Sequence, residues 1–482
     1  MHADDEGRRA LPSAHYVILS SRIVPDLDGG FTVATLRRAR QMADAGADAN
    51  RGPLLLTVDP GTTADHAAHR AALLASGQVQ STDVFCNLFD ELRADPSWAY
   101  DRAKPAEGTP RAPLRAIVDD ADRPVAGIPV VDSPEWFLTD APVVVHGADG
   151  DRFLRGFRGL YHAWLDHVVA RLTRDTPRTP VVVVCESRQV GLLIADWANP
   201  RVRIVHTIHT SHLEPPYTAD APVNALWRRW FDAMPAFDAV LWPTRQQRDD
   251  VEARFGSATV NAVVPHAAPP VAADPAQTVE PRAVILARLA PVKRIAHAVR
   301  AWAQVVREIP GARLDIYGDG PLRADLEREI DDLGVGDRVT LHGHTDRGAA
   351  VFDGAAFAFQ TSAYEGQGLA PLEAMSRGCP VLSYDVRYGP RDRAAVGGEV
   401  LVESGDVDAL AAAAIRLLAD APWRARMSAG ALACAEAFSA SCTTVALGDA
   451  LRAALAGPAR RGATGQGTAG PGTTGPSTAG PA

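Results

Sequence analysis

Cysteine is scarce in this chain, and the few cysteines present form no pattern. The five residues, Cys86, Cys185, Cys379, Cys434 and Cys442, are scattered and odd in number. None lies in a Cys-x-x-Cys pair or at the spacing of a zinc site, so the sequence indicates neither a disulfide framework nor a structural zinc module. This usage predicts a reduced, cytoplasmic compartment.

Positive charge and long apolar runs are also lacking. The formal net charge is −9 over 482 residues, so we expect no general nucleic-acid binding, and an anionic ligand would need a local basic patch. No window shows the long uncharged run of a transmembrane segment, and the acidic start at residues 1–6 is unlike a signal peptide. A peripheral membrane contact remains open.

Two common ligand signatures are missing. The loop Asp28-Gly-Gly30 follows a predicted strand and opens a helix, but no third glycine follows at the spacing of a dinucleotide fingerprint. No Asp-x-Asp pair lies at a strand end before a phosphate loop, and Asp119-Asp120 is typical of a turn. We therefore expect neither an NAD site nor a metal site built on paired aspartates.

Three histidines, His206, His209 and His212, fall within seven residues at the end of a predicted strand. Zinc is one interpretation, but side chains three apart on a strand point to opposite faces. Polar lining of a site is the favoured interpretation, with His209 the better candidate for contacting a ligand and His212 behind it.

What the chain does contain is an alternation of strand-like and helix-like runs, with 46% apolar and 22% charged residues. This alternation predicts an α/β fold with parallel sheets. We expect a first Rossmann-like domain at 12–262 with a β-rich insertion at about 81–156. An interdomain linker at 263–281 precedes a second Rossmann-like domain at 282–456, and 457–482 forms a disordered tail. The two doubly wound domains would face a cleft.

The most informative segment runs from residue 362 to 378 and carries Glu365 and Glu373 around a glycine loop. Gly366 and Gly368 allow a close backbone approach, and a helix follows, marked by the apolar residues Leu369, Leu372 and Met375. A helix that opens out of a glycine loop presents free N–H groups to an anion such as phosphate. A carboxylate beside such a cradle suits a nucleotide-sugar; a helix cap with two solvated glutamates is the alternative.

Three further loops follow predicted strands of the second domain. Arg288 and Lys293 bracket a short loop before a helix, where cations are unfavourable for the helix dipole unless an anion lies among them. Gly318 belongs to a tight Gly-Asp-Gly turn, and His342 to a polar loop. Each also has an ordinary interpretation, as solvated charges, a common turn or exposed histidines.

The order of these motifs resembles the retaining glycosyltransferases of family 4, which have the GT-B fold. The resemblance covers nearly the whole second domain and extends to Gly30, His209 and residues 242–247 in the first. The segment Tyr384–Arg391 resembles the subgroup that glycosylates poly(glycerol or ribitol phosphate) wall teichoic acids or serine-rich surface proteins. Members of that subgroup carry a β-rich insertion in the first domain, where 81–156 lies here.

The resemblance implies a role for each candidate residue. Arg288 and Lys293 would neutralise the donor diphosphate, Glu373 would bind the ribose, and Glu365 and His209 would lie at the transferred sugar. The remaining donor-binding residues would be Gly30, Gly318, His342 and the backbone of Gln367, Gly368 and Leu369. Gln367 stands where relatives often have an aromatic residue, a departure expected to alter sugar preference.

The function implied is transfer of a hexose or N-acetylhexosamine from a UDP-sugar, UDP-glucose or UDP-GlcNAc, to a hydroxyl of a cell-surface polymer or surface protein. No metal and no other cofactor would be needed, because cations replace the metal at the diphosphate. Alternatives are a lipid or small-molecule acceptor, a non-catalytic GT-B paralogue, which should lack the cations or glutamates, and an epimerase, for which we find no hydrolytic carboxylate set. A homo-oligomer remains open.

Overall fold

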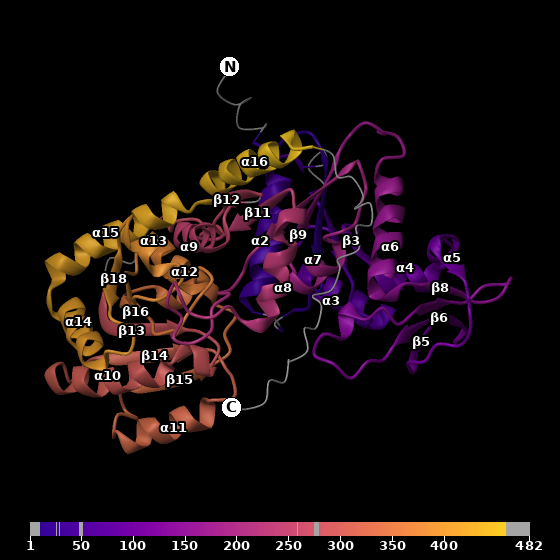
Figure 1. The fold of residues 1–482 in the computed structure, drawn as a ribbon. Helices are drawn as coiled ribbons and strands as arrows, with labels where there is room; N and C mark the ends of the chain where they lie inside the picture. The colour runs from indigo at the N-terminus through magenta and orange to yellow at the C-terminus, as the bar shows by residue number, and fades with distance from the viewer. Residues whose placement is uncertain are drawn as a thin grey trace, which may run out of the picture.

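Two lobes lie side by side in the computed structural model, each with a parallel sheet between helices (Figure 1). The structure describes residues 10–458 except 26, 28, 48–51, 258 and 274–278. The predicted α/β class and parallel sheets are confirmed. Nearly all of the tail predicted from residue 457, and Asp28 of the first glycine loop, lie outside the described residues.

The first lobe is built on seven parallel strands in the order β12-β11-β10-β9-β1-β2-β3. The run Val181–Val184 is buried on both faces of this sheet, which explains why it is continuously apolar rather than alternating. The strands are β1 (His15–Ser20), β2 (Leu54–Thr57), β3 (Phe85–Asn87), β9 (Val181–Cys185), β10 (Val202–Thr207), β11 (Ala239–Trp242) and β12 (Val260–Val263). The helices are α2 (Gly30–Asp44), α3 (Thr63–Ala75), α6 (Gly156–Leu172), α7 (Arg188–Ile194), α8 (Ala225–Ala233) and α9 (Arg245–Phe255), with a 3₁₀ turn η3 (Met234–Ala236).

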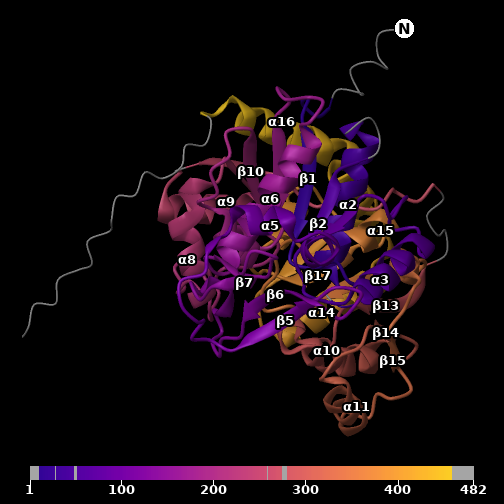
Figure 2. The same ribbon diagram turned by 90° about the vertical axis from the view of Figure 1, so that its right-hand side faces the viewer.

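The insertion forms a separate antiparallel sheet in the order β4-β8-β7-β6-β5. Figure 2 shows β5, β6 and β7 on the side of the first lobe opposite α16. Its strands are β4 (Lys104–Pro105), β5 (Leu114–Val118), β6 (Pro124–Pro129), β7 (Val143–Val145) and β8 (Arg152–Leu154), with the helices α4 (Leu88–Ala94), α5 (Ser97–Arg102) and η2 (Trp136–Leu138).

The start of the insertion differs from the expected residue 81. Strand β3 pairs in parallel with β2, with Leu56 opposite Cys86, so it completes the main sheet. Two helices then precede the inserted sheet, the first capped by the Asn87 side chain, which accepts from the amide of Phe89 at 2.8 Å. A three-residue strand is too short to show a period in the sequence.

The second lobe has six parallel strands in the order β15-β14-β13-β16-β17-β18, the strand order of a doubly wound Rossmann sheet. The strands are β13 (Glu280–Leu286), β14 (Arg313–Tyr317), β15 (Val339–Gly343), β16 (Ala355–Gln360), β17 (Val381–Tyr384) and β18 (Glu399–Val402). The helices are α10 (Ile295–Glu308), α11 (Arg323–Asp332), α12 (Leu369–Ser376), α13 (Pro390–Ala394), α14 (Val407–Ala419) and α15 (Ala421–Ala437), with the 3₁₀ turns η4 (Pro291–Lys293) and η5 (Gly348–Phe352).

The last helix, α16 (Ala440–Ala456), corrects the expected second domain at 282–456. Its side chains Leu447 and Leu451 are buried in the first-lobe core with Ile18 and Val205. Figure 1 shows α15 and α16 running along the top of both lobes. An apolar helix face reveals that a helix is buried but not which sheet receives it, so the sequence pattern could not place α16.

The stretch Ala421–Ala456 is the one helical segment of the described residues that is long and apolar enough to cross a membrane by composition. The sequence pattern had indicated no such run. Its mean hydropathy reaches 1.3 over an 18-residue window, of which 39% is buried. In the fold it comprises two helices, because Phe438 ends α15 and the Ser439 side chain caps α16.

Candidate active site

The predicted site loops leave the sheets at their topological switch points. In the first lobe β1 and β9 are neighbours whose chains continue to opposite sides of the sheet, and in the second lobe β13 and β16 are the equivalent pair. Crevices outside the carboxyl ends of such strands are where open α/β sheets bind ligands. Arg288 follows β13 and Glu365 follows β16, whereas Glu186 follows β9.

Lys293 and Glu365 form an ion pair at the second switch point. Lys293 Nζ lies 2.7 Å from Glu365 Oε1, and the same oxygen accepts a hydrogen bond from Ser362 Oγ at 2.6 Å. Burial alone would raise the pKa of Glu365, but Lys293 and these hydrogen bonds hold it below its ordinary value. The two side chains therefore form a charged pair of fixed geometry.

Two hydrogen bonds to backbone carbonyls join the loops that carry this pair. Thr361 Oγ1 donates to the Lys293 carbonyl at 2.8 Å, and the Ala363 amide donates to the Val292 carbonyl at 2.7 Å. Lys293 itself ends the 3₁₀ turn η4, after which Arg294 adopts a left-handed φ of 46° as the N-cap of α10. The chain thus turns sharply directly after Lys293, which carries the ammonium group of the ion pair.

A buried arginine, Arg393, holds the glycine loop before α12 in place. Arg393 contacts Glu399 through Nε at 2.7 Å, donates to the Gln360 side chain at 2.6 Å and also donates to the Gln367 carbonyl. Gly368 has a φ of 89°, and a Cβ there would lie 2.6 Å from Gln360 Nε2. Glycine is required here for both conformation and space. No motif in the sequence pointed to Arg393.

Gln367 has a different role from the one expected of its side chain. Its Oε1 accepts from the His266 amide at 2.7 Å and its Nε2 donates to the His266 carbonyl at 3.2 Å. The side chain is buried, 4% exposed, against the interdomain linker. It is therefore directed at the linker and not at an open sugar site.

Glu373 connects the two lobes. Its Oε1 lies 2.6 Å from the guanidinium NH2 of Arg37, which belongs to α2 of the first lobe. Beside this pair, a Cβ on Gly30 would lie 3.6 Å from Leu369 Cδ1, so the first-lobe loop lies against the start of α12. The predicted residues Gly30, Leu369 and Glu373 are thus brought together, with Arg37 as an additional partner that the sequence did not reveal.

His209 is held by a buried carboxylate of the first lobe. Its Nε2 lies 2.6 Å from Glu186 Oε2, and Arg38 Nε lies 3.0 Å from the other oxygen of Glu186. Burial would raise the pKa of Glu186, but Arg38 and His209 hold it below its ordinary value. The His209 ring stacks on His266 at 5.1 Å and meets Phe31 edge-on at 4.9 Å. Glu186 and Arg38 lie outside every motif identified in the sequence.

The other two histidines of the cluster point elsewhere, which removes the zinc interpretation. His206 packs between Trp230 and Phe237, and burial lowers its pKa to about 3. His212 packs against Phe231 and stacks on Tyr388, and burial lowers its pKa to about 4. Across the described part of the chain, no group of three or more His, Cys, Asp or Glu side chains could hold a metal ion.

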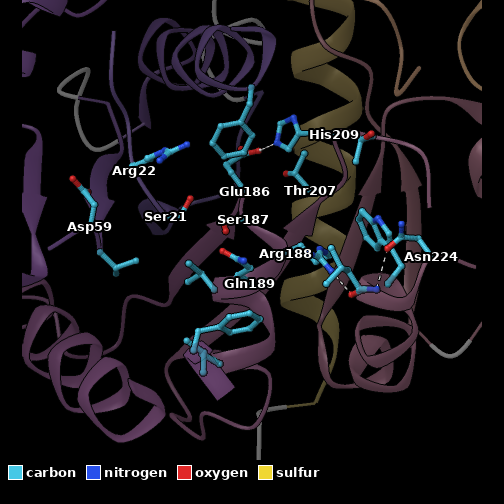
Figure 3. A pocket seen from close by; sticks show the side chains of 18 of the residues that line it. Ser21, Arg22, Asp59, Glu186, Ser187, Arg188, Gln189, Thr207, His209 and Asn224 are labelled. Carbon is cyan, nitrogen blue, oxygen red and sulfur yellow. Dashed lines mark hydrogen bonds and ion pairs between the residues drawn. The ribbon is translucent and has the colours of Figure 1, made fainter. Parts of the chain in front are cut away.

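A cavity of about 690 Å³ opens beside His209 (Figure 3). Most of its wall comes from the first lobe, including Glu186, and the second lobe contributes Arg288 and Tyr364. Figure 3 shows the bond between Glu186 and His209 at its edge. Arg288 is exposed and, within the described residues, has no carboxylate partner. The cavity therefore joins an uncompensated cation of one lobe to an oriented histidine of the other.

Of the predicted site residues, only His209 and Arg288 line this cavity, and the others, His342 and Gly318 among them, do not. His342 is paired with Asp315 at 2.9 Å and stacks on Tyr317 at 4.4 Å, on the face of the second sheet. Gly318 has a φ of 128°, and a Cβ there would lie 2.0 Å from the Ala287 carbonyl oxygen. Gly318 thus permits a close approach beside the Arg288 loop, and a donor-binding role for either residue stays a prediction.

Comparisons with known proteins agree with this arrangement. The family described as "Glycosyl transferases group 1" matches residues 273–433. These residues form a glycosyltransferase group 1 domain. The match contains Arg288, Lys293, Glu365 and Glu373, the residues on which the resemblance in the second domain rests.

The chain is similar to the poly(glycerol-phosphate) alpha-glucosyltransferase of Bacillus subtilis, with 35% identity over 222 residues. The aligned region covers 45% of this chain and 33% of that relative, so the chain spans about a third of the relative's length.

Two solved structures resemble nearly the whole chain. A mutant of S. aureus TarM in complex with fondaparinux, alpha-GlcNAc-glycerol and UDP gives a TM-score of 0.69 at 17% identity, covering 91% of this chain and 99% of that chain. The pneumococcal O-GlcNAc transferase GtfA in complex with UDP and GlcNAc gives 0.70 at 16% identity, covering 92% and 100%. The predicted GT-B fold is confirmed.

Proposed function

We propose that the protein is a retaining hexosyltransferase that transfers a hexose or N-acetylhexosamine from a UDP-sugar to a hydroxyl group. The acceptor is a teichoic-acid-like cell-surface polymer or a surface protein. The carrying observation is the cavity at which Arg288 of the second lobe meets the His209–Glu186 pair of the first. The Lys293–Glu365 ion pair lies in the adjoining loop, directly after Tyr364 of the cavity wall. UDP in both structural neighbours supports the choice of donor.

The main contribution of these residues to the reaction is positive charge held in a fixed position. As the sugar leaves, negative charge grows on the diphosphate, and cations fixed beforehand at that oxygen stabilise the transition state more than the ground state. Lys293 is fixed by Glu365, and Arg288 carries a charge that no described carboxylate neutralises. Gly368 is the N-cap of α12, and the free amides at the start of a helix favour an anion.

Both carboxylates of the cavity wall are already paired, which supports a transfer that retains the anomeric configuration of the sugar without a protein nucleophile. Asp59 and Glu186 are the carboxylates that line the cavity, and both are engaged by histidines, Asp59 by His66 at 2.9 Å and Glu186 by His209 at 2.6 Å. In the proposed step, the acceptor oxygen attacks the sugar carbon from the side of the leaving group. The bond from this carbon to the diphosphate oxygen breaks, and that oxygen takes the acceptor's proton.

No metal is needed in this proposal, because Arg288 and Lys293 supply the charge at the diphosphate. Transfer should proceed unchanged in EDTA, and a strict requirement for Mg²⁺ or Mn²⁺ would contradict the assignment. The five cysteines are all free, which supports work in a reducing, cytoplasmic compartment where nucleotide-sugars would be the donor pool.

A thermal-shift screen across nucleotide-sugars tests the donor without knowledge of the acceptor. A ligand at 100 times its Kd stabilises the native state by about 2.7 kcal/mol, which corresponds to roughly 5–10 °C for a domain of this size. We expect UDP-glucose or UDP-GlcNAc to raise the Tm of the wild type and to do so less in Arg288→Ala. Equal or absent shifts for all nucleotides would overturn the proposed donor site.

A further inference from the structure

An exposed tryptophan of the insertion lines the cavity. Trp136 is 41% exposed, whereas most of the nine tryptophans are buried. It belongs to η2, between β6 and β7 of the inserted sheet, yet it contributes to the same wall as His209. The insertion therefore reaches the reaction cavity and is not only an appendage of the first lobe.

The position of Trp136 is fixed by its neighbours. The next residue, Phe137, is buried in the first-lobe core, and the Trp136 ring meets Phe157 of α6 edge-on at 5.1 Å. The preceding residue, Glu135, forms an ion pair with Arg229 of α8 at 2.8 Å. No hydrogen bond of the Trp136 indole is found among the described residues, and with 41% of the residue exposed its ring can contact a ligand.

Besides the charged residues Arg22, Asp59 and Arg188, the wall combines apolar surface with neutral polar groups. Leu226 of α8 is 43% exposed and lines the same cavity, with Trp227 beside it. Amide and hydroxyl groups of Ser187, Gln189 and Asn224 face the cavity between them (Figure 3). Large apolar side chains that remain exposed inside a hollow mark a binding surface. A mixture of this kind suits a molecule with C–H faces and many hydroxyls, because the faces stack and the hydroxyls form hydrogen bonds.

We propose that Trp136 is an acceptor-binding residue whose indole stacks on a sugar or polyol unit, so that the insertion completes the acceptor site. This inference rests on the proposed function, since a molecule in this cavity presents its hydroxyl to the donor side formed by Arg288 and Tyr364. A carbohydrate-like acceptor is favoured over a peptide by the neutral polar groups of the wall.

Binding of defined probes in the presence of UDP tests the inference directly. The probes are a glycerol-phosphate oligomer, maltotriose and a serine-rich peptide, and the variants are Trp136→Ala and Trp136→Phe. The matched control is Val130→Ala, which removes another exposed apolar side chain of the insertion (54%) that does not line the cavity.

We expect wild type to bind at least one of the two polyhydroxylated probes. Trp136→Ala should weaken that binding roughly 10- to 100-fold, as for other tryptophan anchors. Trp136→Phe should lose less probe affinity, and Val130→Ala should bind the probe as wild type does. The affinity for UDP should be unchanged in all variants. Unchanged probe affinity in a folded Trp136→Ala, preference for the peptide, or no binding of either polyhydroxylated probe would overturn the inference. If wild type does not bind UDP, the result would instead contradict the proposed function.

Discussion

Lys293→Ala is the substitution that bears most directly on the site. The ammonium group lies 2.7 Å from Glu365 Oε1, and Ser362 Oγ donates to the same oxygen. The lysine side chain is 26% exposed and the glutamate 13%. The substitution therefore removes one cation from the donor site and at the same time leaves a largely buried carboxylate with one hydroxyl partner.

These two effects have different magnitudes and can be separated. A hydrogen bond to a charged group contributes about 1.5–3 kcal/mol to stability, so a loss of about 2 kcal/mol should lower the Tm by roughly 4–8 °C. Removing one group that stabilises the charge of the transition state should lower kcat about 10²–10³-fold. The KM of the donor should rise less, because the charge on the diphosphate grows mainly in the transition state.

The assay compares kcat, donor KM and Tm of Lys293→Ala with those of the double variant Lys293→Ala/Glu365→Gln. The double variant removes the uncompensated charge and should recover much of the Tm but none of the activity. Lys104, the other lysine of the sequence, is exposed on β4, and Lys104→Ala serves as the matched control. A folded variant without Lys293 whose kcat stays within about threefold of wild type would refute the diphosphate assignment.

Three further substitutions probe the surroundings of the site. Gly366→Ala would place a Cβ 2.1 Å from the His209 carbonyl oxygen, so the lobes must separate and kcat should fall about 10²-fold with circular dichroism unchanged. Glu186→Gln leaves the buried Arg38 without a counter-charge, and urea denaturation should show a loss of about 3 kcal/mol. His66, hydrogen-bonded to two aspartates despite burial that opposes its charge, has a pKa raised to about 9. Its stabilisation is complete below pH 6.5 and lost as pH rises through 9, so Tm should fall over this window in wild type and stay flatter in His66→Gln.

Much of the fold was predictable from the sequence because its strands are buried on both faces. Val181–Val184 is continuously apolar, and such runs, separated by helical periods, indicate parallel sheets before any contact is known. Strand β3 could not be identified, since it has three residues, and α16 was assigned to the wrong lobe. In both cases the missing information is a long-range contact, which local periodicity does not contain.

The site was predictable in part for a related reason. Lys293 and Glu365 were each selected from local motifs, but their ion pair depends on two loops 72 residues apart that meet only at a switch point. Arg37 and Trp136 carry no local signal at all. Arg37 lies in a helix with two other arginines, and Trp136 lies in a three-residue 3₁₀ turn of the insertion. Only the folded chain shows that both reach the cleft.

The contact between Arg37 and Glu373 also bears on how donor binding and lobe closure are related. Arg37 uses one nitrogen for Glu373 Oε1, while its NH1 is buried without a hydrogen-bond partner among the described residues. A carboxylate can accept on both oxygens, and within the described residues Glu373 Oε2 receives no hydrogen bond. One open donor and one open acceptor thus lie on neighbouring side chains of opposite lobes. A ribose hydroxyl donates to Glu373 Oε2 in this proposal without displacing the ion pair, whereas the buried NH1 of Arg37 is reached only after a local shift of its side chain. Under the proposed function, donor binding would then stabilise the closed arrangement of the lobes, because both groups are adjacent only when the lobes are together.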